Sequence, residues 1–524
     1  MKCIARILIL ILIATVAKAQ DSTLVMSAPI DISQEGWHKV IRMTNGNTLL
    51  FHFELRKHIR VKVFDKDAKE IASTILALSI FNVNALDRSY FDGLHEIRGN
   101  AVLFVTQKVY NSETLLRITV DGKTGTLIAE DIAVKSKSFT NTTRAILIKL
   151  QAEEGYAIFC YNYKKGEDST LLKILYYDSW HALKKEVHHA VASKNLDQVV
   201  FLGVNIAKDG SILAAIKTRK IIQQGSSFDS KIHLMYVPTD WGRAIVNTIQ
   251  LPEQENVTGI DFLKNSFSNN INILVHSTMS PIVYVGLNHV RTKIFEVNML
   301  VIPEDFSSVN EKMLKHSMAV NYIKKERNNP SDLIIENPIL DACYTHSSGI
   351  TTTIFKEAKL SKEIKQFPTL HTGKYLITKY NDNGEEIWAT ALQNSHYYTV
   401  KDITPNVFIS KNTKQSLFED ITTITENTAW MVFNDIDSNF NKTLNDKMID
   451  LYEYDKTNTV YYHINKKKVV TKKYFFGKPN ASIYQQVYPG SQYFDESTNT
   501  LTVLTRKVDG NKETLHIATR KMEE

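Results

Sequence analysis

A twelve-residue segment near the C-terminal end of the chain carries the side chains best suited to bind a metal ion. In residues 435–446, oxygen-bearing side chains stand at positions 1, 3, 5, 7, 9 and 12. A hard cation such as Ca²⁺ is held by a shell of this kind. The hypothesis of a calcium site therefore names as ligands Asp435, Asp437, Asn439, Asn441 and Asp446.

Two positions of this segment depart from a calcium-binding loop. Phe440 stands at position 6, where the sharp turn favours glycine, and Asp446 stands at position 12, where a longer glutamate is usual. The alternative is a solvated turn, because Asp and Asn side chains favour turns by bonding to the nearby backbone. Calcium is the one cofactor that the sequence suggests.

A second candidate site lies in the aromatic and lysine-rich segment 452–494. It holds 11 aromatic residues among 43, against 10% aromatic residues in the whole chain. Rings interleaved with cations bind glycans or anionic polymers. In the alternative interpretation the rings fill the space between packed sheets and the lysines protect exposed strand edges. The candidate ligand-binding residues are Tyr461, Tyr462, Lys467, Lys468, Tyr474 and Phe475.

Motifs for catalysis are absent from the sequence, so the catalytic residues of any activity are unknown. There is no G-x-S-x-G elbow, no H-E-x-x-H pair, no Walker loop and no dinucleotide fingerprint. His188 and His189 would point to opposite faces of a strand, which disfavours a shared metal ion.

The elements that must position these residues are predicted to be β-hairpins. Segment 115–134 alternates apolar and polar residues on both sides of Asp121-Gly122, which is a strong hairpin signal. Similar hairpins recur near Asp65, Asp178 and Asp240, at spacings of 56, 57 and 62 residues. Weaker or more widely spaced copies lie near Asp305, Asp382 and Asp455.

A repeat of this length built only from short strands predicts the blades of a β-propeller. Grouping the expected strands favours eight blades in one ring, with seven as the alternative count. The last unit lacks a strand and Thr23–Ile30 has no hairpin partner, so this segment is expected to pair beside Thr514–Thr519 and close the ring. An irregular insertion, with room for one helix, is expected at about 304–340.

The N-terminus resembles a cleaved export signal. Lys2 and Arg6 precede an apolar run that ends at Ala17-Lys18-Ala19. We therefore expect a signal peptide at 1–19, one propeller domain at 20–524, and a periplasmic, cell-surface or secreted protein. The apolar run is too short to span a bilayer. Cleavage of the signal peptide removes three cations and lowers the formal charge from +7 to +4. A net charge of +4 is too small to indicate nucleic-acid binding.

Two cysteines, Cys160 and Cys343, remain after the expected cleavage. They either form one disulfide in an oxidising compartment or remain two buried thiols, and the second interpretation is favoured.

The chain resembles the secreted β-propeller-like proteins of the Bacteroidota type. The resemblance rests on segments such as LITKYNDNGEEIWATAL and VLTRKVDGNKETLHIAT together with the export signal. That group has no established activity and brings no catalytic residues.

The function favoured by these features is an exported, monomeric, non-enzymatic propeller. It is expected to bind a protein or glycan at the cell envelope through loops on one face of the ring. A propeller hydrolase or lyase acting on a glycan or peptide in the central channel is the alternative. A structural part of an envelope assembly is a third possibility. The fold alone does not decide among them, because propellers host unrelated functions.

Overall fold

The computed structural model describes residues 23–523 with internal gaps. The gaps are 33–35, 55–56, 110–111, 136–143, 150–154, 163–167, 207–210, 224–226, 239, 241, 243, 251–254, 265–269, 280–294, 304–309, 314–337, 347, 349, 362–368, 382–385, 395, 400–419, 443–447, 449–455 and 481. The expected export signal at 1–19 lies outside the described residues. In the described part of the chain, no helix is long and apolar enough to cross a membrane.

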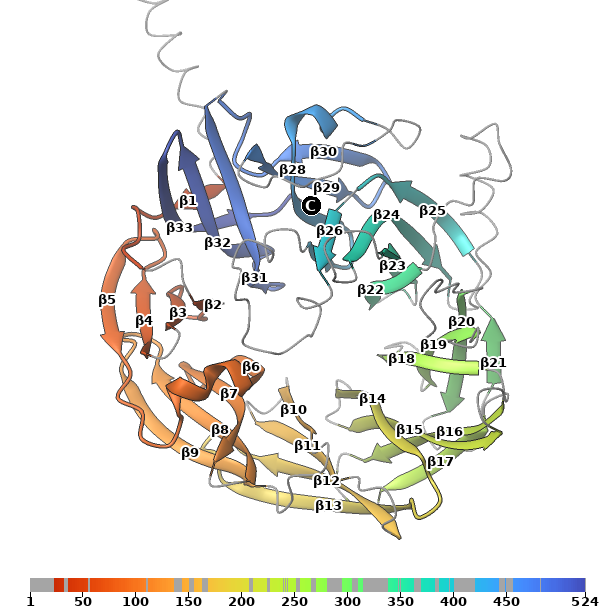
Figure 1. Cartoon of the computed structure of the whole chain (residues 1–524). Coiled ribbons are helices and arrows are strands. Elements are labelled where there is room, and N and C mark those ends of the chain that lie inside the picture. Colours follow the sequence, from red (N-terminus) through yellow and green to blue (C-terminus); the bar gives the residue numbers. More distant parts are fainter. Residues whose placement is uncertain are drawn as a thin grey trace, which may run out of the picture.

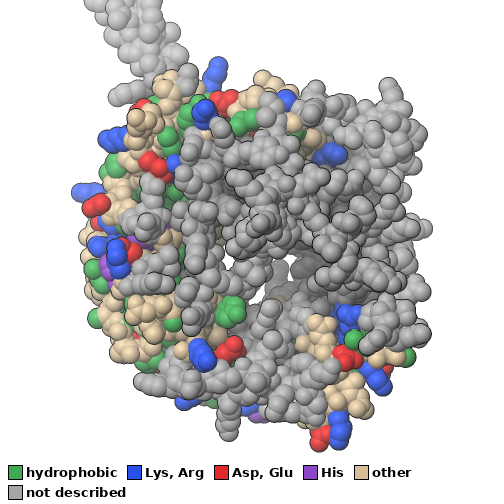
Figure 2. Space-filling model, viewed as in Figure 1, with side chains coloured by type: hydrophobic (Ala, Val, Ile, Leu, Met, Phe, Trp, Pro, Cys, Tyr) green, Lys and Arg blue, Asp and Glu red, His purple; other side chains and the backbone are tan. Residues whose placement is uncertain are grey.

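The described strands pair into eight antiparallel sheets that follow one another around a ring (Figure 1). Each sheet has four strands in meander order, and one sheet carries a fifth. The ring is a β-propeller, as the hairpin repeat predicts, and the eight sheets agree with the favoured count of blades. In the same view, Figure 2 shows the Lys, Arg, Asp and Glu side chains of the described residues scattered over the surface of the ring.

The strands are named here blade by blade, from the innermost strand outward (Figure 1). The first blade consists of β2 (Trp37–Arg42), β3 (Thr48–Glu54), β4 (His58–Phe64) and β5 (Glu70–Ile75). The second consists of β6 (Tyr90–Ile97), β7 (Asn100–Val109), β8 (Ser112–Asp121) and β9 (Leu127–Lys135). The third consists of β10 (Arg144–Lys149), β11 (Tyr156–Asn162), β12 (Ser169–Tyr177) and β13 (Leu183–Ala192). The 3-10 helix η1 (Val83–Arg88) connects the first blade to the second.

The next three blades contain the fifth strand mentioned above, β26 (His396–Thr399), which pairs with β24. The fourth blade consists of β14 (Gln198–Ile206), β15 (Ile212–Gln223), β16 (Ser227–Val237) and β17 (Ile245–Gln250). The fifth consists of β18 (Glu255–Lys264), β19 (Asn270–Met279), β20 (Phe295–Pro303) and β21 (Asn310–Met313). The sixth, which carries β26, consists otherwise of β22 (Pro338–Thr345), β23 (Thr351–Ser361), β24 (Thr369–Tyr380) and β25 (Glu386–Leu392). β21 falls inside the segment 304–340 that was expected to be an insertion, and it supplies the fourth strand of its blade.

The last two blades bring the C-terminus back to the N-terminus. The seventh blade consists of β27 (Ile421–Ile424), β28 (Ala429–Asp435), β29 (Asn458–Ile464) and β30 (Val470–Tyr474). The eighth consists of β31 (Ile483–Asp495), β32 (Thr500–Asp509), β33 (Lys512–Lys521) and β1 (Leu24–Met26). A short 3-10 helix, η4 (Asp437–Asn439), lies between β28 and β29.

The ring closes through the pairing of β1 with β33. Val25 lies opposite Thr519, and Ile30 forms a further bridge to Leu515. The backbone N–H of Ser27 donates to Ile517 O at 2.9 Å. The expected pairing of Thr23–Ile30 beside Thr514–Thr519 is therefore confirmed, and it covers the edge that β33 would otherwise leave unpaired.

The core is a series of apolar layers between neighbouring blades. Successive side chains of a strand point to opposite faces of its sheet. Phe51 of β3 is buried against the second blade, whereas the adjacent Leu50 is buried against the last blade. Both faces of a blade are thus apolar, which explains the nearly continuous burial along β3.

The recurring aspartates cap the turns between the third and fourth strands of the blades. Asp65 Oδ1 accepts from the backbone N–H of Asp67 and Lys69, and Asp121, Asp178 and Asp240 accept in the same way from the residues that follow them. Asn465 takes this role between β29 and β30. Asp305, Asp382 and Asp455 lie outside the described residues. In the described turns, the repeated aspartate therefore marks the connection between the third and fourth strands of the first four blades, held by an Asx hydrogen bond.

Candidate binding face

One side of the ring is formed by the capped turns and is called here the turn face. Since strands alternate in direction, the connection between a blade's first and second strands lies at the same end as that between its third and fourth. Hydrogen bonds join these turns across blades. Asn47 Nδ2 donates to Gly122 O at 3.2 Å, and Lys185 Nζ donates to Asp240 O at 2.9 Å. On the turn face, the first blade is therefore bonded to the second, and the third to the fourth.

Trp180 is the most exposed large apolar side chain among those described, with 71% of its surface accessible. It lies in the Asp178-capped turn between β12 and β13, and its own backbone N–H donates to Asp178 Oδ1 at 2.9 Å. The guanidinium carbon of Arg98, from the second blade, lies 3.0 Å from the centre of the Trp180 ring. A cation over an exposed aromatic face contributes about 0.5–1 kcal/mol.

The backbone that presents these two side chains has an unusual conformation. Arg98 (φ 51°) and Gly99 (φ 74°) are the two turn residues between β6 and β7, and both have positive φ, as in a type I′ hairpin turn. His181, next to Trp180, also has a positive φ of 66°. Such values are uncommon outside glycine and cost free energy, so they concentrate where the surrounding structure or a function requires them.

A buried polar network supports the turn that carries Trp180. Arg117 donates to the Tyr156 hydroxyl and pairs with Asp131 at 2.9 Å. The same hydroxyl lies 3.1 Å from His181 Nδ1, and the Tyr156 ring stacks on Tyr177. Burial, followed by the Arg117 guanidinium, lowers the pKa of His181 from 6.5 to about 4. His181 is therefore neutral near pH 7 and acts as a hydrogen-bonding support.

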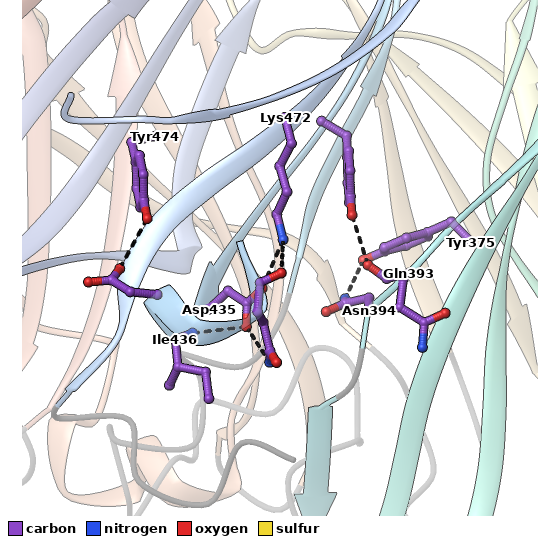
Figure 3. A network of polar contacts seen from close by, with 10 residues as sticks. Tyr375, Gln393, Asn394, Asp435, Ile436, Lys472 and Tyr474 are labelled. Atoms are coloured by element: carbon purple, nitrogen blue, oxygen red, sulfur yellow. Dashed lines mark hydrogen bonds and ion pairs between the residues drawn. The ribbon is translucent and has the colours of Figure 1, made fainter. Parts of the chain in front are cut away.

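The described predicted metal ligands lie at the end of β28 and in the segment that contains η4, and Figure 3 shows Asp435 among them. Asp435 is buried, and its Oδ1 accepts from the backbone N–H of Ile436 and from Asn439 Nδ2, each at 2.9 Å. Lys472 Nζ lies 3.1 Å from Asp435 Oδ2 and 3.1 Å from the carbonyl oxygen of Asn439. The lysine ammonium thus contacts a carboxylate oxygen of Asp435, which the calcium hypothesis assigns as a ligand, and the main-chain oxygen of Asn439.

Asp437 and Asn441, two further predicted metal ligands, do not join Asp435 and Asn439 in the described structure. Asp437 is exposed and its Oδ1 accepts from Asn458 Nδ2 at 3.1 Å. Asn441 is exposed, and Asp446 lies outside the described residues. Across the described part of the chain, no group of three or more His, Cys, Asp or Glu side chains is arranged to hold a metal ion.

Half of the predicted ligand-binding residues are buried between blades. Tyr461 packs towards the last blade and the adjacent Tyr462 towards the preceding one, while Phe475 is buried in the same layer as Tyr461. The Tyr462 hydroxyl donates to Gln393 O at 3.1 Å. Their rings are positioned for packing rather than for contact with a ligand.

The remaining predicted ligand-binding residues are at least partly accessible. The Tyr474 ring is half-buried and stacks on Phe440 at 4.1 Å, and its hydroxyl faces Asp437 (Figure 3). Lys467 and Lys468 are exposed in the turn between β29 and β30, on the turn face. The six residues therefore do not form one site.

A second buried network lies close to the Lys472 cluster, as Figure 3 shows. Asn394 Nδ2 donates to the Tyr375 hydroxyl at 3.2 Å, and that hydroxyl donates to Asp420. The Asp420 side chain is fully buried and also pairs with Lys356. These contacts link the sixth blade to the start of the seventh, which is a structural role.

His346, a buried histidine that follows β22, has partners for both ring nitrogens. Nε2 lies 2.6 Å from Thr352 Oγ1, and Nδ1 lies 3.9 Å from Glu426 Oε2. The ring is buried and packs edge-on against Tyr344. His346 is thus engaged within the protein.

Cys160 is a buried free thiol, as the favoured interpretation of the cysteines holds.

Comparison with known proteins adds no function to this fold. No protein-family model and no curated protein matches the chain. Among solved structures, a mutant of the Synechocystis apocarotenoid oxygenase is 8% identical, with a TM-score of 0.36, over 96% of this chain and 92% of that one. The WD40 domain of SCAP from fission yeast is 7% identical, with a TM-score of 0.37, over 95% and 98%. At these scores neither likeness carries an argument about activity.

Proposed function

We propose that this protein is a non-enzymatic β-propeller of the cell envelope that binds a protein or glycan partner through its turn face. The observation that carries the proposal is Trp180, which is 71% exposed and held under the Arg98 guanidinium of the neighbouring blade. Tryptophan and arginine are the residue types most enriched among those that dominate binding energy at interfaces. The polar network beneath Trp180 fixes the turn in advance, which lowers the entropic cost of binding.

One further part of the proposal, export, rests on the sequence. Export rests on the signal-like residues 1–19, and the mature chain would begin at Gln20. N-terminal sequencing of the protein from the producing cell tests the cleavage site, and an intact N-terminus on the mature protein contradicts it. The alternative of a hydrolase or lyase rests on no catalytic motif of the sequence, and no residue is proposed as its acid or base.

The test is a glycan and peptide array screened with the purified protein and two variants. Trp180→Ala removes the exposed indole, and Leu183→Ala is the matched control, since Leu183 is 49% exposed on the same hairpin. We expect binding to at least one array member, at least tenfold weaker for Trp180→Ala and within about twofold for Leu183→Ala. Binding that is equal in all three proteins, or turnover of a bound member, contradicts the proposal.

A further inference from the structure

We propose that the pair Arg98 and Trp180 is a receptor for a carboxylate group, so that the partner of the turn face presents an acidic peptide segment. This inference rests on the proposed function and names the chemistry of the partner. It begins from how Arg98 is held. Among the described residues, its guanidinium makes no hydrogen bond or ion pair, and its contact is the ring of Trp180.

Two buried arginines of the described chain, Arg117 and Arg506, differ from Arg98 in this respect. Arg117 is buried and bonded to Asp131, and Arg506 is buried and bonded to Glu513. Arg98 is exposed, on a turn whose two residues both have positive φ. Within the described structure, no ion pair of Arg98 offsets the free-energy cost of this turn conformation.

A guanidinium stacked on a ring uses its π face for that contact. Its in-plane N–H donors stay available, and their fork matches the two oxygens of a carboxylate. Because the Trp180 ring limits the rotation of the guanidinium, less conformational entropy is lost when a carboxylate binds. The exposed remainder of the indole would contact the aliphatic part of an Asp or Glu side chain.

The charges around the pair favour an anion of a single charge. Asp178, the nearest acid on the turn, accepts from two backbone N–H groups and pairs with Lys184 at 3.0 Å. Asp131 is paired with Arg117 below the turn. Arg98 is therefore the uncompensated cation among these described groups. One guanidinium balances a carboxylate, whereas a phosphate of nearly two charges would need a second cation.

The test measures binding of two labelled peptides, an alternating Gly-Glu peptide and its Gly-Gln counterpart. Arg98→Asn removes the guanidinium and suits the left-handed backbone, which Asn tolerates. Arg98→Lys keeps the charge but removes the fork. Lys123→Gln, on a neighbouring turn of the same face, is the matched control for loss of one positive charge. Thermal unfolding of each variant verifies that it is folded.

We expect the glutamate peptide to bind and the glutamine peptide to bind at least tenfold more weakly. Arg98→Asn should weaken the glutamate peptide at least tenfold, Arg98→Lys by an intermediate factor, and Lys123→Gln by less than about twofold. Equal binding of the two peptides, or an unchanged affinity in Arg98→Asn, overturns the inference. Tighter binding of a Gly-phosphoserine peptide also overturns it, because the receptor would then favour phosphate.

The outcome separates this inference from the proposed function. If the glutamate peptide does not bind but Trp180→Ala still abolishes binding to a neutral array member, the turn face is a binding face and the carboxylate inference is wrong. If neither Trp180→Ala nor Arg98→Asn alters binding to any member, both proposals are wrong.

Discussion

Lys39 Nζ donates a hydrogen bond of 2.6 Å to the carbonyl oxygen of Gly490, although 451 residues separate them. Lys39 lies on β2, the inner strand of the first blade, and Gly490 lies on β31, the inner strand of the last. One residue further on, Ser491 Oγ donates to His38 O at 2.8 Å. The ring is therefore closed at its inner edge as well as by β1 at its outer edge.

This double closure predicts that β1 stabilises the ring without being needed for its assembly. Val25→Pro removes the backbone N–H that faces Thr519 and leaves its acceptor unbonded. We expect a loss of about 1–3 kcal/mol in the free energy of unfolding, measured by urea denaturation with one transition retained. Val25→Thr, which keeps the N–H and favours a strand, is the control and should cost less than about 1 kcal/mol. A fully unfolded Val25→Pro protein would mean that the inner contacts of Lys39 contribute little.

Because Lys472 and Asp435 form a buried ion pair, we expect the removal of one partner alone to destabilise the folded protein strongly. The side chains are 9% and 1% exposed, so Lys472→Met leaves a buried, uncompensated carboxylate. We expect this variant to lose about 3 kcal/mol or more of stability. Adding Asp435→Asn should restore most of the loss, as read from a double-mutant cycle of urea midpoints. If the double variant is as unstable as the sum of the two single variants, the two residues are not coupled.

The same pair predicts how the loop responds to calcium. Because the Lys472 ammonium already contacts Asp435 Oδ2 and Asn439 O, a divalent cation would meet a like charge there. We expect millimolar Ca²⁺ to leave the unfolding temperature of the wild-type protein unchanged relative to a chelator. A calcium-dependent rise would support the sequence-based hypothesis, with Asp446 and neighbouring residues as the added ligands.

Most of the fold follows from local patterns of the sequence. Alternation of apolar residues gives the strands, and the aspartate in each turn, such as Asp121, gives the repeat. The pattern failed to predict β6, where a bulge between Phe91 and Gly93 shifts the register and interrupts the alternation. It also failed to predict β21, a strand of four residues that is too short to show a period.

The candidate site was not predictable in the same way. Arg98 and Trp180 are 82 positions apart, and only the stacking of adjacent blades brings their turns together. The local signals were an Arg-Gly pair in a two-residue hairpin and a tryptophan in a capped turn. The aromatic residues that did stand out, Tyr461 and Tyr462, owe their enrichment to packing on both faces of one blade.

Burial of Cys160 predicts a thiol that is inert in the folded protein. Burial raises its pKa from 9.0 to about 12, so almost no thiolate is present at mildly alkaline pH. We expect no alkylation of Cys160 by iodoacetamide in the native state and complete alkylation in denaturant, measured by peptide mass mapping. Mapping resolves Cys160 from the other cysteines. Rapid native labelling of this residue would show that the strand β11 opens readily.

The low pKa of His181 predicts a loss of stability in mild acid. Its folded-state pKa of about 4 lies below the ordinary 6.5, so between these values the unfolded chain binds a proton that the folded protein does not. Stability contributed by neutral His181 is therefore present above about pH 6.5 and is lost as the pH falls towards 4. The charged groups that face the ring are Arg117, Asp131, Asp178 and Arg98.

The matching experiment compares the wild-type protein with His181→Asn, which keeps a polar side chain and tolerates the positive φ. The full pKa shift corresponds to about 3 kcal/mol, but the half-exposed ring is screened by water, so we expect about 1 kcal/mol. The free energy of unfolding is measured by urea denaturation near neutral pH and near pH 4.5. Its change between the two pH values should be smaller in the variant than in the wild-type protein by about 1 kcal/mol. An identical pH dependence in both proteins would mean that His181 is not held neutral by the Arg117 network, since other buried histidines are unchanged in the variant.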